Sequence, residues 1–198
     1  MNKILIASNN THKINEIRSV LKDITGIQLY SLNDFGITTE VIENGTTLEE
    51  NAFKKAKEIY DILNIPSLSD DTGLFVDELE GAPGVYSARY AGEHVSYEDN
   101  CNKLLSELKN VPENKKTASF RSVICYYKDP GEFRFFKGLC KGRIISKPRG
   151  HNGFGYDPVF IPEGMSKTFA ELTDEAKNSI SHRAIALKEF RKFSDSYF

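Results

Sequence analysis

Two aspartates stand side by side in this 198-residue chain, at positions 70 and 71 of the segment Ser-Asp-Asp-Thr-Gly (residues 69–73). Adjacent ionised carboxylates repel each other, and a bound cation relieves that repulsion. Mg²⁺ typically takes one or two protein carboxylates and shares its other positions between water and phosphate oxygens. Because Asp and Gly are also common turn residues, an ordinary polar turn fits the same segment. The segment therefore indicates a metal site without identifying a substrate.

A second polar segment, residues 8–13 (Ser-Asn-Asn-Thr-His-Lys), follows a predicted strand at residues 3–8. It precedes a predicted helix with apolar residues at positions 14, 17, 21 and 24. The N–H groups at a helix start attract anions, whereas Lys13 there opposes the helix dipole. An anionic ligand would remove this conflict. Taken alone, a phosphate site and a solvated lysine beside an Asn-rich turn fit the segment about equally well.

Two further segments could contact a nucleotide. In residues 153–158 (Gly-Phe-Gly-Tyr-Asp-Pro), the glycines would let the backbone approach a ligand, and Phe154 offers a face on which a base can stack. Lys177, His182 and Arg183 supply hydrogen-bond donors near a predicted helix start. Each segment also fits a structural role, as a loop with core aromatics or as a surface helix terminus. No Walker A pattern occurs in the sequence, which argues against a P-loop protein.

Alternating strands and helices must position these segments. Thr47 and Glu50 form a predicted capping box for a helix that ends before Pro66. The other predicted elements are strands at residues 27–30, 67–70, 74–79 and 159–161, a hairpin of residues 118–127 and 132–139, and helices from Ser96 and from about Ser181. Strands and helices alternate early and antiparallel strands dominate the middle, which predicts an α/β fold with a mixed sheet. No repeat or linker is visible, so we expect a single domain over residues 1–198.

The composition is that of a globular protein, with 39% hydrophobic and 27% charged residues. The net charge of −2 implies no general polyanion-binding surface, but it conceals an asymmetry. The first 99 residues carry 8 basic and 17 acidic side chains, a net −9, and the remaining 99 carry 18 and 11, a net +7. Such a split fits a basic nucleic-acid face, or a cleft lined by metal-binding carboxylates and phosphate-binding cations.

Cysteine use and hydropathy indicate a reducing compartment. The three cysteines, at positions 101, 125 and 140, include no Cys-x-x-Cys pair, which argues against a disulfide framework or a thiolate zinc site. The sequence contains neither a signal-peptide core nor an apolar stretch of 18 residues. We therefore expect a cytoplasmic protein with no membrane partner.

Taken in order, seven motifs resemble the inosine/xanthosine triphosphate pyrophosphatase (ITPase) family over essentially the whole chain. They are residues 8–13, Glu43-x-Gly45, Glu50-Asn51-Ala52, residues 69–74, residues 81–90, residues 153–158, and a C-terminal set of residues 170–172, Lys177 and residues 180–183. One such motif would be weak evidence, whereas seven in register leave little room for coincidence. Departures are small: Ser-Asn-Asn replaces a common Thr-Gly-Asn, and Ile42 stands where an acidic residue is frequent.

The resemblance implies an elongated mixed sheet with flanking helices, and two lobes that enclose a nucleotide cleft. It also implies a homodimer and Mg²⁺-dependent hydrolysis of nonstandard purine triphosphates (ITP, dITP, XTP) to the monophosphate and pyrophosphate. Carried over by position, it makes Asp71 the proton acceptor and Glu43 and Asp71 the metal ligands. The substrate-binding residues that it implies are Ser8, Asn9, Asn10, Thr11, His12, Lys13, Lys55, Thr72, Phe154, Gly155, Tyr156, Asp157, Lys177, His182 and Arg183.

Base selection can be expected from the donors at positions 177, 182 and 183. Hypoxanthine and xanthine present an acceptor oxygen at C6, where adenine presents an amino donor. Buried donors aimed at that edge would be satisfied by the oxygen and left unpaired by the amino group. Phe154 would instead stack on any base.

Two other functions remain open. One is a Maf-type nucleotide pyrophosphatase with a different base preference; residues 182–183 and the Phe154 loop favour the ITPase side. The other is a catalytically silent module that binds nucleotides or RNA; the acidic first half and the Glu43/Asp71 pair argue against it. We therefore expect a small-molecule nucleotide substrate and no nucleic-acid partner.

Overall fold

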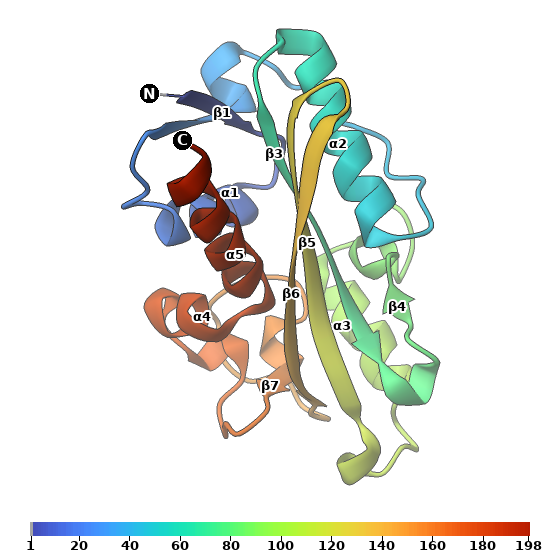
Figure 1. Ribbon diagram of the computed structural model, residues 1–198. Helices are drawn as coiled ribbons and strands as arrows, with labels where there is room; N and C mark the ends of the chain where they lie inside the picture. Colours follow the sequence, from blue (N-terminus) through green and yellow to red (C-terminus); the bar gives the residue numbers. More distant parts are fainter. Residues whose placement is uncertain (1) are drawn as a thin grey trace. The chain divides into compact units, whose positions relative to one another are not determined.

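A computed structural model describes residues 2–198 of the chain. The strands are β1 (Asn2–Ile6), β2 (Ile27–Ser31), β3 (Ser67–Val76), β4 (Pro83–Gly84), β5 (Thr117–Asp129), β6 (Glu132–Ile144) and β7 (Phe160–Pro162). The helices are α1 (Thr11–Val20), α2 (Leu48–Leu63), α3 (Tyr97–Glu107), α4 (Asp174–Ile180) and α5 (His182–Tyr197). Figure 1 shows these elements in the order of the chain. Over residues 2–198, no helix is long and apolar enough to cross a membrane.

The strands form one seven-stranded mixed sheet, in the order β2-β1-β3-β5-β6-β7 with β4 paired to β3. β1 is parallel to both β2 and β3, whereas the β3–β4 and β6–β7 pairs are antiparallel. This mixed sheet with flanking helices confirms the predicted fold class.

The chain divides into two compact units. The first unit comprises residues 1–71, 122–138 and 183–198, and the second comprises residues 72–121 and 139–182. The long strands β3, β5 and β6 each contribute residues to both units. The expectation of one domain over residues 1–198 stays a prediction.

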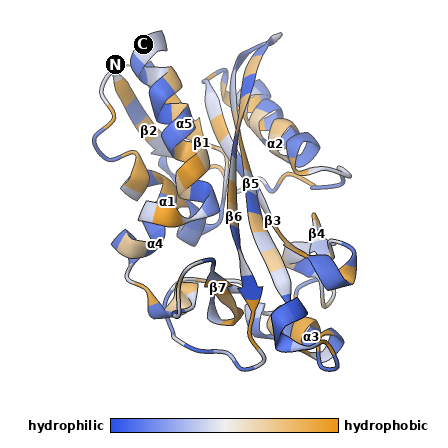
Figure 2. Ribbon diagram, turned by 60° about the horizontal axis from the view of Figure 1, so that its bottom comes forward, coloured by the Kyte–Doolittle hydropathy of each residue, from blue (hydrophilic) through white to orange (hydrophobic). Residues whose placement is uncertain are grey.

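The core of the first unit follows from the alternation of side chains along β1. Ile4 and Ile6 pack with apolar residues of α1 and α5, whereas Leu5 and Ala7 pack with Ile59 of α2. Accordingly α1 and α5 cover one face of the strands and α2 covers the other (Figure 1). Hydrophobic and hydrophilic residues share each of α1 and α5, as expected of helices with one buried face (Figure 2).

The second unit has its own core, in which the aromatic residues of β5, β7 and the chain after β7 pack together. The rings of Phe120 and Phe160 lie 4.8 Å apart, and those of Phe160 and Phe169 lie 5.2 Å apart. Leu104 of α3 and Ile144 of β6 complete the apolar contacts, and both are fully buried. This core supports the loop of residues 153–158 and the helix α4.

The structure corrects one predicted boundary that matters for the site. Residues 71–73 are not a turn between two short strands, because β3 runs without a break from Ser67 to Val76. Gly73 serves the pairing with β4: a Cβ at this position would lie 2.4 Å from the carbonyl oxygen of Gly84. Glycine is needed here for close approach of two backbones, not for a turn. The short helix α4 is a further element that the sequence patterns missed.

Candidate active site

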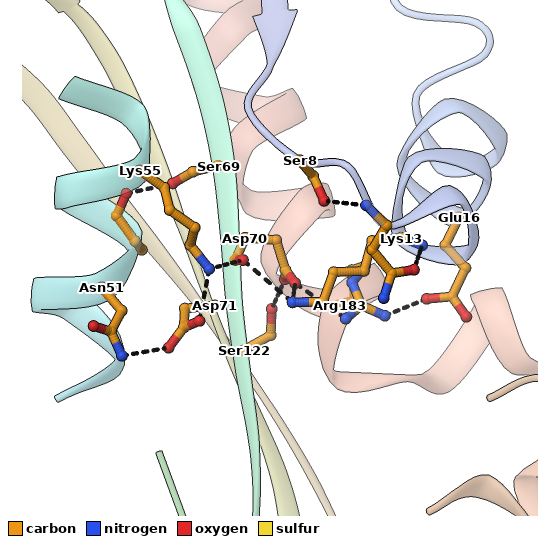
Figure 3. Close-up of polar contacts among 12 residues, drawn as sticks. Ser8, Lys13, Glu16, Asn51, Lys55, Ser69, Asp70, Asp71, Ser122 and Arg183 are labelled. Atoms are coloured by element: carbon orange, nitrogen blue, oxygen red, sulfur yellow. Dashed lines mark hydrogen bonds and ion pairs between the residues drawn. The ribbon is translucent and has the colours of Figure 1, made fainter. Parts of the chain in front are cut away.

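The continuous strand β3 sends its two adjacent carboxylates to opposite faces of the sheet. On the α2 side, Ser67 and Ser69 donate hydrogen bonds to the carbonyl oxygens of Ala56 and Ala52, at 2.6 and 2.5 Å. Asp71 shares that side with Ser69, whereas Asp70 points toward α1 and α5 (Figure 3). Each carboxylate therefore has its own cationic partner, Lys55 for Asp71 and Lys13 with Arg183 for Asp70.

Asp71 lies in a cluster with Lys55 and Glu43. The Lys55 ammonium donates to Oδ1 of Asp71 at 2.7 Å, to Oε1 of Glu43 at 2.6 Å and to the backbone carbonyl of Asp70 at 2.8 Å. Helix α2 supplies Lys55, β3 supplies both aspartates, and the segment before α2 supplies Glu43. Two carboxylates from distant parts of the sequence thus converge on one positive charge.

Burial sets the protonation behaviour of this cluster. Burial lowers the pKa of Lys55, but the charges of Asp71 and Glu43 outweigh burial and raise the pKa above its usual value. The ammonium therefore stays charged at neutral pH. Burial raises the pKa of the Asp71 carboxyl, and Lys55 offsets this only in part. A raised pKa makes a carboxylate a better proton acceptor near neutral pH.

Asn51 joins the backbone of Gly45 to the carboxylate of Asp71, a role that the sequence patterns did not indicate for either residue. Asn51 is fully buried; its Oδ1 accepts from the N–H of Gly45 at 2.8 Å, and its Nδ2 donates to Oδ2 of Asp71 at 3.4 Å. The sequence does contain a signal for this contact. Asn51 and Lys55 are one helical turn apart, each next to an alanine of the apolar face of α2, where a polar pair needs partners.

Gly45→Ala should lower the free energy of unfolding by ~1–3 kcal/mol, because an added Cβ overpacks this site. The Cβ would lie 2.7 Å from Oδ1 of Asn51 and 2.8 Å from Cβ of Glu50. Urea denaturation of the variant measures the change. Ile42→Ala is the control in the same segment, since the Ile42 side chain is 73% exposed. A Gly45→Ala variant as stable as the parent chain would contradict the close packing described here.

The donor set of Glu43 and Asp71 fits a magnesium ion. Their carboxylates already converge on a cation, and two protein carboxylates are the number that Mg²⁺ commonly takes. Among residues 2–198, no group of three or more His, Cys, Asp and Glu side chains is placed to hold a metal by itself. A metal here would therefore need oxygens from water or a ligand to complete its coordination.

Asp70 is the centre of a second ionic cluster (Figure 3). Its Oδ2 contacts Nζ of Lys13 at 2.9 Å and Nη2 of Arg183 at 3.1 Å, and its Oδ1 accepts from the hydroxyl of Ser122 at 2.6 Å. The other terminal nitrogen of Arg183 pairs with Glu16. Burial raises the pKa of Asp70, but Arg183 and Lys13 outweigh it and hold the pKa well below its usual value. Asp70 is therefore ionised at neutral pH.

Asp70 gives Lys13 a carboxylate partner within the protein. The sequence suggested that an anionic ligand relieves the conflict between Lys13 and the helix dipole, whereas the carboxylate of Asp70 already supplies a negative charge. The segment before α1 is also ordered by its own side chains. Asn10 caps α1 by accepting from the N–H of Lys13 at 3.2 Å, and Ser8 accepts from the N–H of Asn10 at 3.2 Å.

In the second unit, Asp157 fixes the glycine-rich loop. Its Oδ2 accepts from the N–H of Phe154 at 2.9 Å and from Nζ of Lys177 at 2.6 Å. Gly153 must lack a side chain, because a Cβ would lie 2.1 Å from that oxygen. The Lys177 ammonium also lies 4.9 Å from the centre of the Phe154 ring. The structure thus brings Phe154 and Lys177 together, and their contact with a substrate stays a prediction.

The other predicted site residues differ in exposure. Tyr156 is buried and donates its hydroxyl to the carbonyl of Ser87 at 2.9 Å, and His182 is buried with its ring stacked on Phe120 at 4.6 Å. These contacts give both side chains a structural role in the second unit. Across both units, the exposed candidates are Asn9, Thr11 and His12, and the half-buried ones are Ser8, Asn10, Lys13, Glu43, Thr72, Phe154 and Gly155.

The fold and the site together define the class of this protein. It is an α/β protein with a mixed sheet, in which Asp71 of β3 joins a cluster with Lys55 and Glu43. The Ham1 family model matches residues 4–193. Proteins named dITP/XTP pyrophosphatase from Thermoanaerobacter pseudethanolicus and Clostridium perfringens are each 47% identical, with 96% of both chains covered. The solved structure of the Staphylococcus aureus Ham1 protein matches with a TM-score of 0.87 at 39% identity, covering all of both chains. A HAM1 protein from Coxiella burnetii gives 0.89 at 35% identity, covering 99% of this chain and all of that one.

The chain belongs to the Ham1 family. This membership confirms the resemblance seen in the sequence motifs.

Proposed function

We propose that this chain hydrolyses nonstandard purine nucleoside triphosphates such as dITP, XTP and ITP to the monophosphate and pyrophosphate. The observation that carries the proposal is the 47% identity, over 96% of both chains, with relatives named dITP/XTP pyrophosphatase. The Asp71–Lys55–Glu43 cluster supports it, because these residue types suit attack of water on a phosphate. The biological role would be removal of deaminated purine nucleotides from the precursor pool.

Asp71 is the proton acceptor in this proposal. It takes a proton from the water that attacks the α-phosphorus, and its raised pKa suits that task. The bond between the α-phosphorus and its bridging oxygen breaks, and pyrophosphate leaves with the bonding electrons. Lys13 and Lys55 would neutralise charge on the phosphates, and the segment of residues 8–13 at the start of α1 would contact them.

Mg²⁺ is the cofactor that we propose, held by Glu43 and Asp71. When bound, the ion would supply positive charge to the phosphate oxygens. Chelation by excess EDTA should abolish turnover, and added Mg²⁺ should restore it.

Residues of the second unit would bind the nucleoside. Phe154 would stack on the base, with Thr72 and Gly155 as further contacts, and Lys177 would act beside the Phe154 ring, where it pairs with Asp157. Tyr156, Asp157 and His182 would position the loop and its neighbours, since their side chains already have internal partners. Arg183 would likewise act indirectly, because both of its terminal nitrogens contact carboxylates.

Phe154→Ala should raise KM for all purine triphosphates by about 5–150-fold and leave the ratio of dITP to dATP turnover nearly unchanged. The reason is that stacking on a base is worth ~1–3 kcal/mol and depends little on base identity. Steady-state kinetics on both substrates measure the ratio. Phe133→Ala is the aromatic control, since Phe133 is partly exposed in the hairpin of β5 and β6. A ratio that collapses in Phe154→Ala would give this residue a role in base selection instead.

A turnover panel tests the proposed function. With Mg²⁺ present, kcat/KM for dITP or XTP should exceed that for dATP or ATP by at least ~100-fold, since a site that hydrogen-bonds one base leaves its groups unpaired with another. A preference for pyrimidine triphosphates would favour a Maf-type activity. Nucleotide binding without turnover of any triphosphate would favour a silent module.

A homodimer and a cytoplasmic location complete the proposal; the homodimer rests on the family resemblance, and the location rests on the cysteine use and hydropathy of the sequence. Sedimentation equilibrium should give about twice the 22.3 kDa mass of one chain.

A further inference from the structure

Lys55 occupies the position between the two candidate metal ligands. Its ammonium has three protons to donate, and three oxygens surround it: those of Glu43 at 2.6 Å, Asp71 at 2.7 Å and the Asp70 carbonyl at 2.8 Å. The ammonium is therefore saturated by the protein itself. Its side chain is 10% exposed, and the two carboxylates beside it stabilise the positive charge of the ammonium.

A divalent cation bound to the same two carboxylates cannot share them with this ammonium at full strength. Like charges a few ångströms apart repel strongly in a site shielded from water. Both cations also need the same oxygens. The lysine must therefore move when both carboxylates bind a metal, and its four-carbon stem allows such a movement.

We propose that Lys55 is a built-in competitor of the metal, which holds the carboxylate pair together when no substrate is present and weakens metal binding in that state. The arrival of phosphate groups would offer the ammonium other acceptors and so release the pair to the metal. By thermodynamic linkage, metal and phosphates would then strengthen each other's binding. Only this release step rests on the proposed function; competition with the metal rests on the contacts of Lys55 alone.

The neighbouring lysine provides a matched control. Lys54 is on the same helix, and it contacts Oδ1 of Asn44 at 2.9 Å and Oε1 of Glu58 at 3.7 Å. Lys54→Gln and Lys55→Gln remove the same charge from adjacent positions. Any difference between them reports on the carboxylate pair and not on the net charge of the protein.

Mn²⁺ binding without nucleotide, measured by electron paramagnetic resonance of the free ion, tests the competition. Lys55→Gln should lower the Kd for Mn²⁺ by about tenfold or more, the size expected for loss of a directly competing charge, and Lys54→Gln by less than about threefold. An unchanged or raised Kd in Lys55→Gln would overturn the proposal. So would an equal decrease in both variants.

The wild-type chain provides a second measurement, which also serves if Lys55→Gln does not fold. Lysine acetylation by acetic anhydride is quantified at each site by mass spectrometry, with and without saturating Mn²⁺. The metal should raise the modification of Lys55 severalfold relative to Lys54, and an unchanged ratio would overturn the proposal. Because neither measurement uses turnover, failure of the competition is distinguishable from failure of the proposed activity, which the triphosphate panel decides.

Discussion

Asp71→Asn should lower kcat by about 10²-fold or more, while the variant stays folded. The amide removes the proton acceptor and one metal ligand together, and a positioned base alone contributes about 10²–10⁴-fold. The fold should survive because asparagine has nearly the same shape and its amide oxygen can still accept from Lys55, which also keeps its contact with Glu43. Steady-state kinetics at saturating Mg²⁺, with a circular dichroism melt of the same sample, measure both effects.

The control for Asp71→Asn is Asp61→Asn. Asp61 is on α2 and forms an exposed ion pair with Lys57, with both side chains almost half exposed. This variant should keep the turnover of the parent chain. Near-full activity of Asp71→Asn at saturating Mg²⁺ would show that the residue is not the proton acceptor.

The neighbouring substitution, Asp70→Asn, should act on stability first. It leaves Lys13 and the buried Arg183 without their shared carboxylate, and breaking a buried ion pair from one side costs ~3–5 kcal/mol. Urea denaturation should show this loss, whereas the same change at the exposed Asp61 should have little effect. Substitution of the two adjacent aspartates should thus have different effects. Asp71→Asn should lower activity, and Asp70→Asn should lower stability.

A stable Asp70→Asn variant would contradict the account of the second cluster. In that case the carboxylate of Asp70 would not be the main counter-charge of Arg183, and Glu16 would have to supply it.

Local signals predicted much of the fold. Thr47 caps α2 by accepting from the N–H of Glu50, and Ser96 with Asp99 forms a capping box at α3. Each cap depends on residues within one turn, which is why spacing alone reveals it. In the predicted capping box, Glu50 would accept from the N–H of Thr47. In the structure, its carboxylate accepts from the N–H of Thr46 at 2.6 Å.

The missed features depend on long-range contacts. Residues 71–73 have turn composition, but Gly73 is required by a strand ten residues further along, which composition does not reveal. Helix α4 has only seven residues, too few for a clear apolar period. The first error thus follows from a tertiary contact that overrides local preference, and the second follows from the shortness of the helix.

The candidate site likewise has one part that the sequence motifs indicated and another part that they did not. Motif resemblance indicated Glu43, Lys55 and Asp71, and the structure brings these three together. It did not indicate that Lys13 and Arg183 share Asp70, because these partners are 57 and 113 residues from it in the sequence. Lys13, for which the sequence suggested an anionic ligand, therefore already has a carboxylate partner within the protein.

The products of dITP turnover test the central claim most directly. Phosphorus NMR of a reaction with Mg²⁺ should show pyrophosphate and dIMP appearing in equal amounts, because water attacks the α-phosphorus. Appearance of inorganic phosphate and dIDP as the first products would instead place the attack at the γ-phosphorus, and would contradict the assignment of this chain as a nucleoside triphosphate pyrophosphatase.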